Sequence, residues 1–167
     1  MYYTKFKTSM CDVIIIGDES GIKRIHLNVE NSNRELYLDE NWILNDEFFD
    51  DAKSQLKEFF EGDRKTFDLK LNPDGTDFQK CVWEALKDIG YGETASYKDV
   101  AMMIGNEKAS RAVGMANGKN PLPIVIPCHR VIGSNGKLTG YAFGMTLKKK
   151  IIELEKHWLF FDWLDLW

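Results

Sequence analysis

Short runs in the first half of the chain alternate between apolar and polar residues, which is the pattern of half-buried β-strands. Three such runs occur, at residues 2–8, 11–29 and 65–71. Gly17 and Gly21 mark a turn within the second run. Residues 45–62 instead repeat their apolar positions at helical spacing and end at Gly62. The pattern therefore predicts a small N-terminal sheet accompanied by one helix.

Helical spacing replaces this alternation after a turn-rich segment at residues 71–77. Residues 77–90 carry one apolar stripe, so we expect a helix there with Cys81 buried as a small hydrophobic residue. We place a domain boundary in the turn segment, between an N-terminal α/β domain at 1–76 and a mainly helical C-terminal domain at 77–167. The chain as a whole is predicted to be an α/β (α+β) protein.

Two short helices joined through a glycine turn are predicted at residues 95–106 and 107–118. Ser96 begins the first of them with the spacing of a capping box. The second carries Lys108 and Arg111 as candidate groove readers. This arrangement is typical of a helix-turn-helix, although it is a weak signal by itself.

The composition is that of an ordinary globular protein, with 44% hydrophobic and 29% charged residues among 167. Cys11, Cys81 and Cys128 cannot all pair within the chain, and they favour the reducing cytoplasm. The N-terminus lacks the apolar segment of a signal peptide, and no apolar run approaches the length of a membrane span. We expect a cytoplasmic protein with no membrane partner, whose aromatic tail at 157–167 packs against the rest of the chain.

The net charge of −4 hides an uneven distribution. Residues 1–76 hold 10 Lys or Arg against 16 Asp or Glu, whereas residues 77–167 hold 12 against 10. Residues 96–150 hold nine basic side chains and two acidic ones. Because distant charges are screened by salt, this local excess attracts a polyanion in spite of the total. A solvated basic face is the alternative that charge alone leaves open.

The segment "PCHRV" at residues 127–131 places a candidate nucleophile next to a candidate base. Cysteine attacks as a thiolate, whose pKa falls at a helix N-terminus or beside a cation. The apolar run 123–126 predicts a short buried strand, and Pro127 favours a helix start, so we expect a helix dipole to lower the pKa of Cys128. Neighbouring side chains diverge on a helix, so His129 is expected to reach the sulfur through a water.

His129 also needs an acidic partner to orient its ring. The acidic side chains between it and the tail are Glu153 and Glu155, and a buried structural thiol remains the alternative to a catalytic Cys128. A zinc site has poor support, because the three cysteines and three histidines show no paired ligand spacing. We therefore expect no metal.

Residues 111–144, together with the segment "KKKIIELE" that follows, resemble the O6-alkylguanine-DNA alkyltransferases. The resemblance extends from about Phe78 to Glu155, whereas the N-terminal part matches in size and strand-helix pattern alone. It implies that a damaged guanine is flipped out of double-stranded DNA and passes its O6-alkyl group irreversibly to a cysteine, without a cofactor. It also implies a ribonuclease-H-like N-terminal domain, a winged-helix-like helix-turn-helix domain and a monomer. O4-alkylthymine is a second candidate substrate.

The same resemblance implies roles for individual residues. Cys128 is the alkyl acceptor, His129 the water-linked base and Glu155 the carboxylate that orients the histidine. Asn120 braces the helix-turn-helix against the active-site segment. Tyr97 helps to rotate the nucleotide and protonates the leaving guanine.

DNA contacts and a substrate pocket follow from the same comparison. Arg111 resembles the arginine that takes the place of the flipped base in the stack. Further expected DNA contacts are Tyr97, Lys108, Ser110, Ala112, Lys119 and Arg130. The expected pocket residues are Tyr141, Phe143, Pro123, Val131 and Met115. Phe143 stands where the family pattern has glycine, so the pocket is expected to be narrower unless the ring points away from it.

Two other functions remain open on the sequence. A non-reactive lesion-binding relative is disfavoured, because that group lacks the cysteine that is present here as Cys128. A cysteine hydrolase with a Cys-His-Glu relay would turn over repeatedly and would not need a basic helix-turn-helix. Formation of an adduct distinguishes the first alternative, and stoichiometry distinguishes the second.

Overall fold

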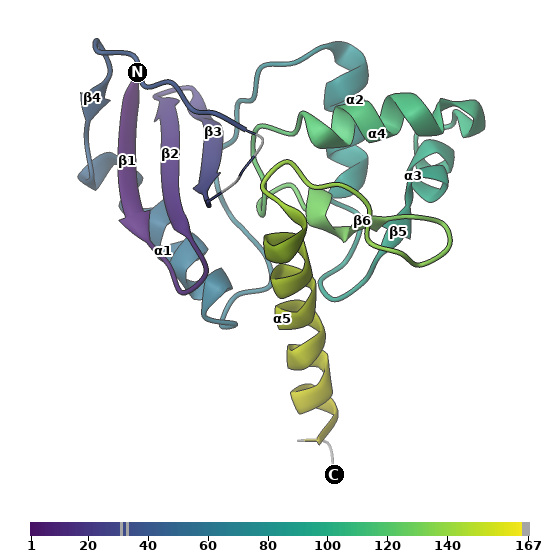
Figure 1. The fold of residues 1–167 in the computed structure, drawn as a ribbon. Helices are drawn as coiled ribbons and strands as arrows, with labels where there is room; N and C mark the ends of the chain where they lie inside the picture. Colours follow the sequence, from purple (N-terminus) through teal and green to yellow (C-terminus); the bar gives the residue numbers. More distant parts are fainter. Residues whose placement is uncertain (31, 33, 165–167) are drawn as a thin grey trace.

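The computed structural model describes residues 1–30, 32 and 34–164, with side chains described as far as His157. Most of the aromatic tail, which we expected to pack, therefore lies outside the described side chains. Figure 1 shows a sheet with one helix on one side of the molecule and a group of helices on the other. No helix in the described ranges is long and apolar enough to cross a membrane.

The N-terminal sheet has the strand order β3-β2-β1-β4. Its strands are β1 (Tyr2–Lys7), β2 (Asp12–Asp18), β3 (Gly21–Asn28) and β4 (Ile43–Leu44). The first three run antiparallel, and β4 pairs parallel with β1. Ile15 lies opposite Ile25, and both are buried in the core with helix α1 (Asp50–Phe60), which a short 3₁₀ turn at Glu47–Phe49 precedes. The expected sheet with one helix is thus present.

The expected third strand at residues 65–71 is wrong in its pairing. The segment is extended and forms a single bridge, between Ile22 and Leu71. Its alternation is satisfied by packing, because Phe67 contacts the core while the residues beside it are more exposed. The backbone N–H and C=O of Asp68 bond the side-chain amide of Gln55 on α1 instead of a neighbouring strand. At Asp68, the Gln55 side chain therefore makes the two hydrogen bonds that a neighbouring strand would otherwise make.

Four helices and a small parallel pair of strands make up the second half of the chain. The helices are α2 (Asp77–Leu86), α3 (Tyr97–Met103), α4 (Ser110–Gly118) and α5 (Met145–Leu164), with β5 (Ala95–Ser96) beside β6 (Val131–Ile132). Helices α2 and α3 begin with complete capping boxes, the second formed by Ser96 and Asp99 as expected. A 3₁₀ turn at Glu107–Ala109 leads into α4. The two predicted helices of the helix-turn-helix are therefore confirmed as α3 and α4.

Cys81 is exposed, so the expectation that it is buried is wrong. Helix α2 is rotated so that it buries Val82, Trp83 and Leu86. The reason is the indole of Trp83, which reaches α4 and donates to the carbonyl oxygen of Ala116 at 2.9 Å. A large ring that must reach a neighbouring helix sets which face turns inward.

The apolar run 123–126 is buried as its composition suggests, but it forms a tight turn and not a strand. Ile126 donates its N–H to the carbonyl oxygen of Leu122 at 2.9 Å, and Ile124 has a φ of 74°. Non-glycine residues adopt this left-handed conformation only where the surroundings hold them there. The turn ends at Pro127, directly before Cys128.

Candidate active site

Cys128 lies at the wall of a cavity, at the start of a three-residue 3₁₀ helix, Cys128–Arg130. This helix is too short to have a useful dipole, so the expected lowering of the pKa by a helix N-terminus is wrong. Burial instead raises the pKa of the Cys128 thiol. A hydrogen bond with Asn120 and the positive charges of Lys148 and Arg34 oppose that effect.

A buried carboxylate orients the histidine that follows the cysteine. Glu155 Oε1 lies 2.7 Å from Nε2 of His129, and both residues are almost fully buried. Glu153, the other acidic side chain considered, is exposed. The structure therefore pairs His129 with Glu155, as the family resemblance implied.

Arg130 completes this buried group. Its Nε and Nη2 donate to the Glu155 carboxylate, the latter at 2.9 Å, and its Nη1 donates to the carbonyl oxygen of Ile89 at 2.6 Å. Because these bonds occupy a side chain that is only 7% exposed, the structure does not support the expected contact between Arg130 and DNA. Arg130 serves as the counter-ion of Glu155.

The protonation states within this group follow from its contacts. Burial alone would raise the pKa of Glu155, but bonds and charges from His129 and Arg130 outweigh it and lower the pKa to about 2. Burial lowers the pKa of His129, and this effect exceeds the opposite effect of the bond and charge of Glu155. The imidazole is therefore neutral. An ionised Glu155 accepts, so Nε2 of His129 carries the hydrogen. The buried Nδ1, without a partner among the described residues, is left as the acceptor.

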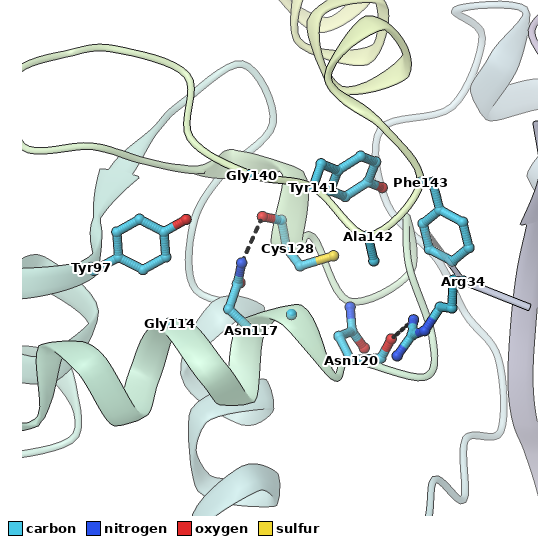
Figure 2. Close-up of a pocket in the computed structure, with 11 residues that line it drawn as sticks. Arg34, Tyr97, Gly114, Asn117, Asn120, Cys128, Gly140, Tyr141, Ala142 and Phe143 are labelled. Carbon is cyan, nitrogen blue, oxygen red and sulfur yellow. Dashed lines mark hydrogen bonds between the residues drawn. The ribbon is translucent and has the colours of Figure 1, made fainter. Parts of the chain in front are cut away.

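The cavity beside Cys128 has a volume of about 270 Å³ (Figure 2). It is lined by Arg34, Tyr97, Gly114, Asn117, Gly118, Asn120, Cys128, Gly140, Tyr141, Ala142 and Phe143. Four of the expected site residues therefore meet Cys128 there, namely Tyr97, Asn120, Tyr141 and Phe143. Pro123, Val131 and Met115 were also expected at the pocket, but they are not among the residues that line it. Pro123 and Val131 are buried in the core, and Met115 is 67% exposed on α4.

Asn120 holds the buried turn that delivers Cys128. Its Nδ2 donates to the carbonyl oxygen of Ile126 at 2.8 Å, and its Oδ1 accepts from the N–H of Leu122 at 3.0 Å. Both bonds span the turn at 122–126, so they stabilise the left-handed residue at its centre. The bracing role expected of Asn120 has a clear geometric basis.

Tyr97 and Phe143 occupy opposite ends of the cavity in Figure 2. The Tyr97 hydroxyl lies 2.7 Å from Oγ1 of Thr139. Phe143 is 2% exposed and lines the cavity, so its ring does not point away into solvent. Its ring centroid lies 5.7 Å from that of Tyr141, and the Arg34 guanidinium stacks over it at 5.4 Å.

Three polar or charged residues at or near the cavity were missed by the sequence analysis: Arg34, Asn117 and Lys148. Arg34 comes from a loop of the N-terminal half, and its Nη1 donates to the carbonyl oxygen of Asn120 at 2.7 Å. Nothing in its local pattern indicates this role. Lys148 is fully buried, and its Nζ donates to the carbonyl oxygens of Val131 at 2.6 Å and Thr139 at 3.0 Å. Burial lowers the pKa of Lys148 to about 8.

A detectable signal for Lys148 was present in the sequence. It stands four residues before Ile152 and seven before Glu155, so all three share one face of α5. Two charged residues on an otherwise apolar helix face indicate charges that are buried with hydrogen-bond partners.

Apart from Tyr97 on α3 and the buried Arg130, the expected DNA-contacting residues lie on and directly beside α4. Lys108, Arg111, Ala112 and Lys119 are exposed, and Ser110 is half-buried. Helix α4 packs against α3 and, through Trp83, against α2. It therefore presents Arg111 outward on a fixed support, with Lys108 just before the helix and Lys119 just after it, as a recognition helix does.

Family comparisons agree with this architecture. Residues 1–73 match the description "6-O-methylguanine DNA methyltransferase, ribonuclease-like domain", and residues 77–157 match "6-O-methylguanine DNA methyltransferase, DNA binding domain". The chain belongs to the 6-O-methylguanine DNA methyltransferase family. The α/β fold expected from the sequence, with a ribonuclease-like part followed by a DNA-binding part, is confirmed.

Individual members of the methyltransferase family are similar over nearly the whole chain. A methylated-DNA–protein-cysteine methyltransferase of Methanosarcina acetivorans is 50% identical over 93% of this chain and 98% of its own length. The constitutive enzyme of Bacillus subtilis is 44% identical over 93% of this chain and 95% of its own. A crystal structure of Mycobacterium tuberculosis OGT in complex with DNA is 40% identical, covers 95% of this chain and 94% of that one, and has a TM-score of 0.85.

Proposed function

We propose that this protein repairs DNA by direct reversal, transferring an alkyl group from O6-alkylguanine to Sγ of its own Cys128. The observation that carries the proposal is the buried thiol of Cys128 at the wall of a cavity, followed in the chain by the neutral His129, which pairs with the ionised Glu155. Similar proteins that act on methylated DNA support it.

The transfer requires one bond to form and one to break. The proton of the Cys128 thiol passes, through a water, to Nδ1 of His129, which has no other partner among the described residues. The thiolate then attacks the alkyl carbon, the carbon–O6 bond breaks, and its electron pair stays on O6. The departing guanine takes a proton from Tyr97, which lines the cavity. Because the thioether is stable, the protein acts once. The alkyl group passes directly from O6 to the sulfur, so the transfer needs no cofactor.

The positive charges near the cavity explain how a buried thiol becomes reactive. Burial raises the pKa of Cys128, so in the resting protein the side chain is a protonated thiol and not a thiolate. Lys148 and Arg34 both favour the thiolate, and Lys148 does so from a fixed position against the backbone. The thiolate therefore forms when His129 accepts its proton.

We further propose that the substrate is double-stranded DNA and that α4 enters its groove. Arg111 is exposed on this helix and fills the gap left by the extruded base, while Lys108, Ser110, Ala112 and Lys119 contact the strand around it. Extrusion brings the base to the cavity, which is lined by residues of both α4 and the loop after β6. O4-alkylthymine is a second candidate substrate. The protein works as a monomer in the cytoplasm, with domains at 1–76 and 77–167.

A direct test is to incubate the protein with duplex DNA that contains O6-methylguanine and to measure intact and peptide masses. One methyl group per protein is expected, on the peptide that contains Cys128, and Cys128→Ser should bind the DNA without accepting it. Cys81→Ser is the matched control, because Cys81 is exposed and should not matter. Methyl on Cys11 or Cys81 would contradict the mechanism, and repeated turnover would indicate a hydrolase.

A further inference from the structure

Asn117 on α4 is a buried polar residue whose hydrogen-bonding capacity is only partly used. It is 6% exposed and lines the cavity together with Cys128 (Figure 2). Its Nδ2 donates to the carbonyl oxygen of Cys128 at 3.4 Å, a bond that determines which way the amide faces. Its Oδ1 is buried and has no hydrogen-bond partner among the described residues. A buried acceptor in a binding cavity indicates a donor on the ligand.

The chemistry of the damaged base limits which group that donor is. Alkylation at O6 leaves N1 of guanine without a hydrogen, and N9 carries the sugar. The exocyclic amine on C2 is therefore the only N–H donor that O6-alkylguanine offers. An amide oxygen accepts and cannot donate, so it pairs with the amine and with no other polar atom of this base.

The position of Asn117 fits that pairing. O6 and the amine stand at opposite ends of one edge of the base. In Figure 2 the sulfur of Cys128 points toward Ala142, whereas Asn117 lies on the other side of Cys128, at its carbonyl group. A base that holds its alkyl group against Sγ therefore has the far end of the same edge available to Asn117.

We propose that Asn117 determines base specificity by accepting a hydrogen bond from the exocyclic amine of the flipped O6-alkylguanine, a role that rests on the proposed function. O4-alkylthymine has no N–H donor at all, because its N3 carries no hydrogen once O4 is alkylated. The hydrogen bond to Asn117 therefore favours alkyl transfer from guanine lesions over transfer from thymine lesions. A site built to bond a substrate N–H rejects analogues that lack it, since its own buried group is then left unpaired.

The test compares two bases that differ only in the amine. Single-turnover transfer rates are measured on identical duplexes that contain either O6-methylguanine or O6-methylhypoxanthine, which lacks the 2-amino group. The unaltered protein should react about tenfold faster with methylguanine, as one neutral hydrogen bond allows. Asn117→Leu should lower that ratio to near one. Cys81→Ser, a change at an exposed position of α2 outside the cavity, should keep the ratio and serves as the control.

The rate ratio separates recognition from a structural role. If Asn117 only supports Cys128 through Nδ2, Asn117→Leu slows both substrates alike and the ratio stays as it was, which overturns the proposal. Asn117→Ala is the second variant if the leucine protein fails to fold, because alanine is compatible with the helix. A ratio of one in the unaltered protein also overturns it. Absence of any transfer from methylguanine would instead refute the proposed function.

Discussion

Replacing Glu155 by glutamine removes the charge at the centre of the buried group without changing its shape. The amide is nearly isosteric with the carboxylate, so the new side chain fits the same space. The effect of the change is that His129 and Arg130 lose a negatively charged partner. Arg130 then keeps its bond to Ile89 and becomes a buried cation without a counter-ion. His129 loses the ionised acceptor that holds its Nε2 hydrogen.

The size of the effect follows from the pKa of Glu155. It lies at about 2 instead of the usual 4.5, because its bonds and charge pairs with His129 and Arg130 exceed the cost of burial. At about 1.36 kcal/mol for each pH unit, the ionised carboxylate stabilises the fold by about 3 kcal/mol. A lowered pKa means that this contribution is complete above pH 4.5 and disappears as the pH falls through 2. Removing one member of a buried ion pair generally costs about 3–5 kcal/mol, which agrees.

The assay is urea unfolding of the unaltered protein, Glu155→Gln and the control Glu153→Gln, whose side chain is exposed. At pH 7 the first variant should lose about 3 kcal/mol of unfolding free energy, and the control less than about 0.5 kcal/mol. The difference between Glu155→Gln and the unaltered protein should shrink as the pH falls from 4.5 toward 2. Equal stability of the two variants at pH 7 would refute the buried-pair reasoning. Slowing of methyl transfer by Glu153→Gln as strong as that by Glu155→Gln would refute the relay.

Three further predictions concern the cavity and the DNA-binding helix. Phe143→Gly should raise the ratio of the O6-benzylguanine rate to the O6-methylguanine rate, because the ring lines the cavity; an unchanged ratio in folded protein would show that Phe143 does not limit its width. Arg111→Ala should slow repair of duplex DNA more than reaction with a free modified base, which needs no extrusion, and equal slowing would remove its stack-filling role. Lys148→Met should slow transfer by removing a charge that favours the thiolate, whereas Lys149→Met, on an exposed neighbour, should not; equal rates for the two variants in a single-turnover assay would contradict this.

Much of the local structure was predictable because its causes are local. The capping box at Ser96 and the helical spacing of residues 45–62 act within a few residues of chain, and a helix formed at each place, the second over the shorter range Asp50–Phe60. The β2–β3 hairpin likewise follows from apolar strand-forming residues on both sides of the short turn that Gly17 and Gly21 mark. Each of these signals needs no knowledge of distant segments.

The errors arose where a distant partner decided the outcome. Residues 65–71 alternate like a strand, but the Gln55 amide took the place of a neighbouring strand. Cys81 lies on a plausible apolar stripe, yet the reach of Trp83 to α4 turned it outward. The helix whose dipole was expected to act on Cys128 is absent, because the buried turn is followed by a 3₁₀ helix of only three residues.

The sequence by itself determined which groups carry the chemistry of this protein. Cys128 and His129 are adjacent, a glutamate follows on the last helix, and basic residues accompany the predicted recognition helix. Only the tertiary structure decided how these groups are tuned. It set the distance between His129 and Glu155, turned Arg130 inward as a counter-ion, and brought Arg34 and Lys148 close enough to act on Cys128. The physical reason is that charge interactions and burial depend on distances between segments far apart in the chain, which no local pattern of residues specifies.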